Sequence, residues 1–174
     1  MAGISVREAK LGDLDEIVEL RLSLLREYHD HPLYGRLHPD ARRRAHDLYR
    51  TQLASPHETM FVAESGTEIV GVLRCVDMPS SPLLLPEHYC YVSSAYVKPH
   101  TRRKGVLSAL IGAVEHWCDA RGITEMRLHN ANNVRMAEDT WTALGFEVVE
   151  QVRRRATHRP AAHHAGAHSD ARAF

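Results

Sequence analysis

The chain has 174 residues, with 22 basic and 22 acidic side chains and 44% hydrophobic residues. These values are typical of one globular domain with a sizeable core. The balanced charge argues against a nucleic-acid-binding protein, and no apolar run is long enough to cross a bilayer. The N-terminus lacks the basic and apolar regions of a signal peptide, so we expect a cytoplasmic protein without a membrane partner.

The three cysteines follow no metal-binding spacing. Cys75 and Cys90 lie in strand-like runs, and Cys118 lies on the apolar side of a helix. We therefore expect buried, reduced thiols and no metal site.

The first quarter of the chain predicts a strand followed by two helices. Residues 4–9 favour a strand, and a helix is expected over residues 13–28, where Asp13 and Glu16 resemble a capping box. A connector rich in His and Tyr follows. The second helix is expected over residues 40–53, with four residues facing the core: Ala41, Ala45, Leu48 and Leu53.

The remaining elements alternate between strands and helices. Strands are expected at residues 59–64 and 68–77 around a Ser-Gly-Thr turn, at 89–97, at 124–129 and in a final region at 146–153. Helices are expected after Gly105 and over residues 133–144. We place the domain at residues 1–156 and a flexible His/Ala-rich tail at 157–174. This order predicts an α/β fold with a mixed, mostly antiparallel central sheet flanked by helices.

The turn before the long helix carries the clearest chemical signal. Arg102, Arg103 and Lys104 precede Gly105, and Val106 opens an amphipathic helix. Backbone N–H groups at a helix N-terminus have no internal partner, and the helix dipole favours an anion there. The turn therefore predicts a site for a phosphate or pyrophosphate.

The segment Arg102-Arg103-Lys104-Gly105-Val106-Leu107 resembles the acyl-CoA loop of the GNAT N-acetyltransferase superfamily, which reads Arg/Gln-x-x-Gly-x-Gly/Ala. It departs from that pattern at Leu107. Val97-Lys98-Pro99 before the loop and Leu144-Gly145-Phe146 near the end are also similar to the family. The resemblance covers residues 4 to about 155. It implies a GNAT-like sheet whose two central strands, at 89–97 and 124–129, splay apart to admit acetyl-CoA.

The resemblance also implies which residues bind the acetyl-CoA. The backbone of the splayed strand would hold the pantetheine arm, and the basic loop would hold the pyrophosphate. Trp141 stands where many members have a tyrosine that acts as an acid, and we expect it to pack against the cofactor or the core. The expected cofactor-binding residues are Ala95, Tyr96, Val97, Arg102, Arg103, Lys104, Gly105, Val106, Leu107, Ser108, Asn132, Asn133 and Trp141. For the two asparagines, helix capping is an equal alternative.

The family implies that the base lies on the splayed strand, at the positions of Tyr91 and Ser93. Neither is a good base near neutral pH, so they would order water toward Glu87 or His88, or they would only line a pocket. Glu64, on the neighbouring hairpin, is a further candidate. The acceptor site is expected in the connector, with Tyr28, His31 and Tyr34, although a surface loop remains an alternative for these residues.

The function predicted from these features is transfer of an acetyl group from acetyl-CoA to a primary amine of a small molecule, by direct attack in a ternary complex. Two alternatives stay open: an N-acetyltransferase for peptides or proteins, and a non-catalytic module that binds or senses CoA. The expected partners are acetyl-CoA and the amine. The sequence leaves open whether the protein forms a homodimer.

Overall fold

The computed structural model describes residues 3–131 and 135–155, which form a five-stranded sheet in the order β1-β2-β3-β4-β5. The strands are β1 (Ile4–Glu8), β2 (Glu58–Ser65), β3 (Glu68–Pro79), β4 (His88–Val97) and β5 (Met126–Leu128). The first four strands pair antiparallel, and β5 pairs parallel to β4. The predicted mixed, mostly antiparallel sheet is therefore confirmed.

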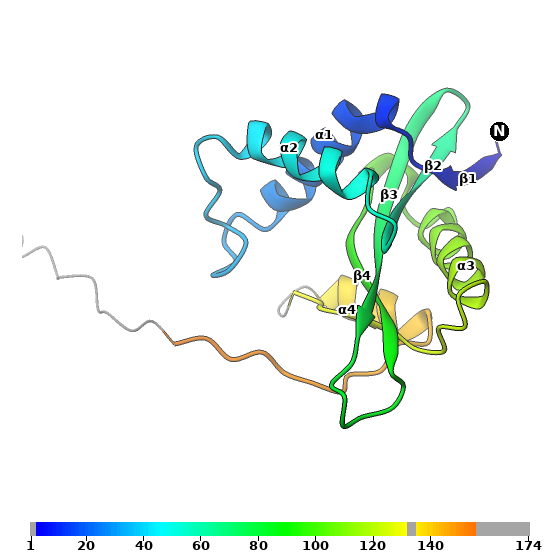
Figure 1. Cartoon of the computed structure of the whole chain (residues 1–174). Coiled ribbons are helices and arrows are strands. Elements are labelled where there is room, and N and C mark those ends of the chain that lie inside the picture. The colour runs from blue at the N-terminus through cyan, green and yellow to red at the C-terminus, as the bar shows by residue number, and fades with distance from the viewer. Residues whose placement is uncertain (1–2, 132–134, 156–174) are drawn as a thin grey trace, which may run out of the picture.

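Helices cover both faces of this sheet (Figure 1). The first face carries α1 (Leu14–Glu27) and α2 (Ala41–Leu53), and the other face carries α3 (Val106–Asp119). The short α4 (Arg135–Ala143) belongs to the α3 side, because Trp141 packs against that core. Two 3-10 turns, η1 (Leu11–Asp13) and η2 (Pro99–Thr101), precede α1 and α3.

Two hydrophobic cores fix these layers. The core under α1 and α2 contains Ile17, Val62 and Tyr96, and the core under α3 contains Leu73 and Leu110, all buried. Alternate residues of a strand point to opposite faces, so the central strands supply both cores. Burial of this apolar surface is the main free energy that holds the helices on the sheet.

The buried stripe of α2 corrects one prediction. Ala41, Ala45 and Leu53 are partly buried and pack against the core, but Leu48 is 52% exposed. The fully buried residue is Tyr49, which continues the four-residue spacing of the alanines. The prediction that Leu48 faces the core is therefore wrong by one position on the helix.

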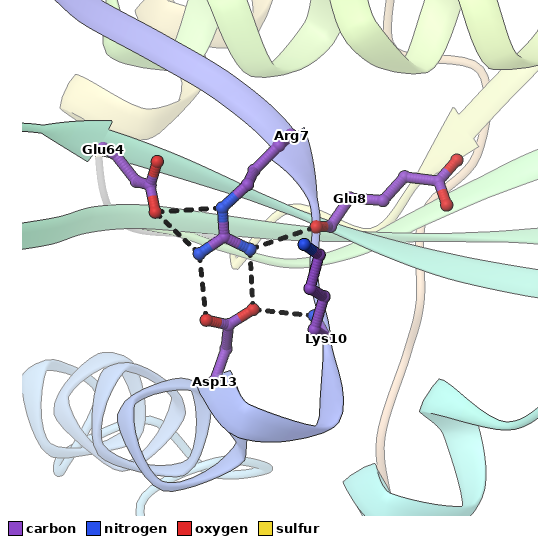
Figure 2. Close-up of polar contacts among 5 residues, drawn as sticks. All are labelled: Arg7, Glu8, Lys10, Asp13 and Glu64. Carbon is purple, nitrogen blue, oxygen red and sulfur yellow. Dashed lines mark hydrogen bonds and ion pairs between the residues drawn. The ribbon is translucent and has the colours of Figure 1, made fainter.

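Asp13 does not cap α1 with its side chain. Its carboxylate instead accepts two hydrogen bonds from the Arg7 guanidinium, at 2.7 and 2.9 Å, and one from the backbone N–H of Lys10 at 2.7 Å (Figure 2). Arg7 also donates to Glu64 from Nε and Nη2, at 2.9 and 2.6 Å. The predicted capping box is thus replaced by an ion-pair cluster that joins β1, β2 and the start of α1.

The expected strand at residues 146–153 is absent from the sheet of the described residues. Val148, Val149 and Val152 are exposed there, and β5, the edge strand beside which they would have to pair, is only three residues long. A strand needs a partner for its backbone groups. The predicted tail at 157–174 lies outside the described residues.

A bulge and a short parallel pairing shape β4. Val72 pairs with Tyr96 and Arg74 pairs with Ser93, so Leu73 alone faces both Ser94 and Ala95. Ser94 has a φ of 55°, which is uncommon for a residue with a side chain. A bulge of this kind bends its strand and leaves ladder groups unpaired.

The parallel contact with β5 is limited to Cys90, Tyr91 and Val92, and the strands separate beyond it. The predicted splay between these two strands is thus present. In the described part of the chain, no helix is both long and apolar enough to cross a membrane.

We expect Arg7→Leu to lower the free energy of unfolding by about 1–3 kcal/mol, the scale for leaving hydrogen-bonded charges without a partner, reduced by the partial exposure of the site. Arg7 holds the pKa of Asp13 below its ordinary value, mainly through their hydrogen bonds. That contribution is complete above the ordinary pKa of an aspartate and is lost as the pH falls through the lower folded-state pKa.

Urea unfolding at several pH values measures this effect. The difference between Arg7→Leu and the parent should be full at pH 7 and should shrink below about pH 4. Arg26→Leu is the control, because Arg26 is exposed and lies 3.9 Å from its carboxylate partner. The structural role of the cluster would be contradicted if Arg7→Leu and Arg26→Leu lost the same free energy of unfolding. It would also be contradicted if the difference between Arg7→Leu and the parent grew as the pH fell.

Candidate active site

A cleft of about 1010 Å³ opens where β4 and β5 separate. One wall is β4 from Tyr91 to Val97, and the opposite wall is the chain just after β5, at residues 129–131. The turn before α3, one face of α1 and one face of α4 complete the lining. The cleft therefore joins segments that are far apart in the sequence.

One end of the cleft is the N-terminus of α3. The first helical hydrogen bond runs from the N–H of Ala109 to the carbonyl of Gly105 at 2.9 Å, so the N–H groups of Val106, Leu107 and Ser108 precede the intrahelical ladder. Gly105 has a φ of +79°, and a Cβ added there would meet no atom within 4 Å. This end presents free donors and open space to a ligand.

The basic residues of the loop before α3, Arg102, Arg103 and Lys104, differ in their contacts. Arg102 donates from Nη2 to Glu27 at 2.6 Å and from Nε to the carbonyl of Val97 at 2.9 Å, and it lies over the Tyr96 ring. Its charge is therefore used to fasten the loop to α1. Arg103 and Lys104 form no ion pair with the described residues, and of the two only Arg103 lines the cleft.

Tyr96 is a packed aromatic. Its ring is buried in the core under α1, and its hydroxyl donates to Glu27 at 3.0 Å. Ser94, Ala95 and Val97 also line the cleft, so the bulge lies in its wall. The side chain of Tyr96 is thus bound within the protein, which is compatible with the expectation that this strand would hold the cofactor through its backbone.

Tyr91 forms a pair that the sequence reasoning missed. Its hydroxyl lies 2.9 Å from Nδ1 of His129, and both residues line the cleft. Burial is the main cause that raises the pKa of Tyr91, so the hydroxyl keeps its proton near neutral pH. His129 directly follows the last residue of β5, and its position at the carboxyl end of a strand parallel to β4 was the available signal.

Ser93 also lines the cleft, but its hydroxyl accepts a hydrogen bond from Nη1 of Arg74 at 3.2 Å. Arg74 is in turn paired with Glu58. The hydroxyl is therefore held by a cation, an arrangement that opposes a role as a base and favours a role in shaping the wall.

Glu64 does not line the cleft, since its carboxylate pairs with Arg7 at 2.6 Å in the cluster of Figure 2. We therefore replace its expected catalytic role with a structural one. The proposed water route toward Glu87 or His88 also loses support, because neither residue lines the cleft and His88 pairs with Asp77 at 2.8 Å.

The connector contributes as expected, but only in part. Tyr28 and Tyr34 line the cleft, whereas His31 lies behind them and stacks on Tyr34 with ring centroids 4.7 Å apart. Trp141 lines the cleft from α4 and contacts the Phe146 ring edge to face. Asn132 and Asn133 lie outside the described residues.

The cysteines do not offer a nucleophile. All three are buried and free, and burial raises the pKa of Cys118 to about 12. The Cys75 contact, together with burial, also raises the pKa of Cys90. A thiolate is therefore strongly disfavoured at either position. Among the described residues, no group of three His, Cys, Asp or Glu side chains is arranged to hold a metal ion.

Known proteins share this fold. The aminoglycoside N(6')-acetyltransferase type 1 of Klebsiella aerogenes is 28% identical over 102 residues, which make up 59% of this chain and 67% of the relative. A predicted acetyltransferase from Clostridium acetobutylicum, solved with acetyl-CoA, matches with a TM-score of 0.72 at 15% identity over 88% of this chain and 96% of its own. The aminoglycoside acetyltransferase AAC(6')-Iy, solved with the bisubstrate analog CoA-S-monomethyl-acetylneamine, has a TM-score of 0.71 at 24% identity, covering 89% of this chain and 100% of its own.

The two solved structures establish the fold, and the family follows from the sequence. The pattern of the acetyltransferase (GNAT) family matches residues 19–146, which include the loop, both splayed strands and α4. The chain therefore belongs to the acetyltransferase (GNAT) family and is an acetyl-CoA-dependent N-acetyltransferase, as its sequence predicted.

Proposed function

We propose that the protein transfers the acetyl group of acetyl-CoA to a primary amine of a small molecule, by direct attack while both are bound. The observation that carries this proposal is the splay of β4 from β5, which opens onto the free N–H groups of α3. A strand edge, an anion site and an aromatic pocket then lie in one cleft.

The residues of the cleft fit the chemical parts of acetyl-CoA. The N–H groups of Val106, Leu107 and Ser108 suit the pyrophosphate, and Arg103 adds positive charge beside them. Beyond Val92, no strand of the described residues pairs with β4 on the β5 side, so its backbone can pair with the amides of the pantetheine arm.

The bulge in β4 supplies donors for the acetyl carbonyl. Leu73 stands opposite both Ser94 and Ala95, which line the cleft, so the ladder is disrupted there and we expect a backbone N–H of this bulge to face the thioester. A fixed N–H aimed at a carbonyl oxygen stabilises the negative charge that develops during attack. We place the reacting thioester at this bulge.

Tyr91 and His129 would remove the proton of the amine. The amine passes a proton to the Tyr91 oxygen while the Tyr91 hydroxyl proton moves to Nδ1 of a neutral His129. The nitrogen forms its bond to the carbonyl carbon, the carbon–sulfur bond breaks, the CoA thiolate takes a proton from solvent, and His129 returns the proton that it received to solvent. Trp141 would not be an acid, because an indole N–H is only a hydrogen-bond donor.

A small acceptor fits the ring-lined end of the cleft. Tyr28, Tyr34 and Tyr91 place three rings around the space next to His129. The curated relative is named for a small-molecule amine acceptor, which favours this class over a peptide or protein amine. Release of free CoA thiol in the presence of amines distinguishes the enzyme from a module that only binds CoA.

We expect Gly105→Glu to weaken acetyl-CoA binding by at least tenfold in a calorimetric titration. The side chain would enter open space at the end of α3, and its carboxylate would repel the pyrophosphate. Gly66→Glu is the matched control, because Gly66 has a φ of +65°, an equally open Cβ position and no place in the cleft. Both variants carry a similar backbone strain, so only a loss specific to Gly105 supports the loop. If Gly105→Glu and Gly66→Glu bound acetyl-CoA with equal affinity, the turn at Gly105 would not be the phosphate site.

We expect Tyr91→Phe and His129→Gln each to lower kcat by on the order of a hundredfold, the lower range for general acid–base help. The double variant should lose little more, because both residues serve one proton path. The KM for acetyl-CoA should stay near the parent value.

Tyr89→Phe is the control for this pair, since Tyr89 lies on the same strand, packs on Arg127 and does not line the cleft. Steady-state kinetics at saturating amine measure the effect. If both single variants kept kcat within threefold of the parent, the proton would leave by another route.

A further inference from the structure

Arg21 lines the acceptor end of the cleft and forms no ion pair with a carboxylate of the described residues. It lies on the face of α1 that lines the cleft, together with Leu24, Leu25 and Tyr28, at the helical spacing i, i+3, i+4 and i+7. The side chain is half-buried. Within residues 3–131 and 135–155, no Asp or Glu forms an ion pair with it.

The surroundings of Arg21 locate it beside the rings. Arg21 and Ser94 both lie near the Tyr49 hydroxyl and oppose the rise that burial causes in its pKa. Burial is the main cause that raises the pKa of Tyr28, Tyr49 and Tyr91, and Arg21 lies close enough to each to oppose that rise. Arg21 therefore lines the same cleft as Tyr28, Tyr34 and Tyr91, with its charge close to these rings.

Two other guanidinium groups in or near the cleft are paired with carboxylates of the protein. Arg74 pairs with Glu58, and Arg102 pairs with Glu27 at 2.6 Å. Glu27 also accepts from Tyr96, so its carboxylate is already shared. The carboxylate of Asp139 lines the cleft from α4, on a different wall from Arg21.

A half-buried charge without a counter-ion is costly, and a ligand that supplies the counter-ion recovers that cost. Guanidinium binds carboxylate or phosphate through paired hydrogen bonds. We propose that the acceptor is an amine that also carries a carboxylate or phosphate, and that Arg21 binds this anionic group while the amine faces Tyr91 and His129. The proposal rests on the acetyltransferase function of the same cleft.

This assignment also predicts which amines are poor acceptors. A polycationic amine would place positive charge near Arg21, and the carboxylate that the described α1 wall offers, Glu27, is already bound by Arg102 and Tyr96. Like charges at such distances repel most strongly where water is partly excluded. Neamine and spermidine should therefore be acetylated less efficiently than an amino acid with an aromatic side chain.

Matched acceptors test the proposal on the full chain. We compare tyrosine with tyrosinamide, 4-aminobutyrate with its amide, and phosphoethanolamine with ethanolamine, and we include neamine and spermidine. For at least one pair, the parent protein should give a kcat/KM at least tenfold higher for the anionic amine. The carboxylate and phosphate pairs show which of the two anions the site prefers.

Arg21→Gln should remove that preference by raising the KM for the anionic amine ten- to a hundredfold, the scale for one charge-assisted contact. The KM for acetyl-CoA and the kinetics of the neutral partner should hardly change. Arg26→Gln, on the exposed side of the same helix, is the matched control, and Arg21→Lys should restore part of the preference.

Three results would overturn the proposal: faster acetylation of neamine or spermidine than of every anionic amine, an unchanged preference in Arg21→Gln, or neither calorimetric binding nor turnover of any anionic amine by protein that binds acetyl-CoA. Failure of acetyl-CoA itself to bind would instead refute the function on which this proposal rests.

Discussion

The short parallel pairing of β4 with β5 is the constraint on which the site depends. A parallel pair requires a crossover connection, and here α3 makes that crossover. The N-terminus of α3 consequently lies at the carboxyl end of β4, where the two strands separate after only three residue pairs. One topological feature therefore brings the free helix donors and the free strand edge into the same cleft.

The ion pairs formed by Arg7 and Arg102 both hold α1 in position. The ion pairs of Arg7 with Asp13 and Glu64 join β1 and β2 to the start of α1. The ion pair of Arg102 with Glu27 joins the basic loop to the end of α1. These partly exposed pairs contribute modest free energy, but they fix the position of α1, which carries one wall of the cleft. Arg103 lies at the phosphate end and Arg21 at the acceptor end, and each has no ion-pair partner in the described part of the chain.

Periodicity predicted most of the fold because burial repeats at the spacing of each element. The strands, the hairpin at Gly66 and the helices α1, α2 and α3 were expected at nearly their observed bounds. The periodicity of a helix locates its buried face only to within about one residue, which is why it predicts Leu48, and not Tyr49, in the core. The strand expected at 146–153 failed because strand propensity does not provide a pairing edge.

The site was harder to predict, because its chemistry depends on contacts between distant segments. The loop and its glycine were visible as a local pattern. The pairing of Glu64 with Arg7, the ion pair of Arg102 with Glu27 and the hydrogen bond between Tyr91 and His129 join residues 57, 75 and 38 positions apart. The bulge at Ser94 also has no local signature, since an ordinary serine adopts a positive φ there under the constraint of the sheet.

Hydrogen exchange of backbone amides, with and without saturating acetyl-CoA, tests the central claim most directly. If the cofactor binds between β4 and the start of α3, exchange should slow at Ala95, Tyr96 and Val97 and at Val106, Leu107 and Ser108. The distant hairpin tip at residues 80–87 should be unaffected. Bound acetyl-CoA, proven by calorimetry, that slowed exchange in neither segment would contradict the account.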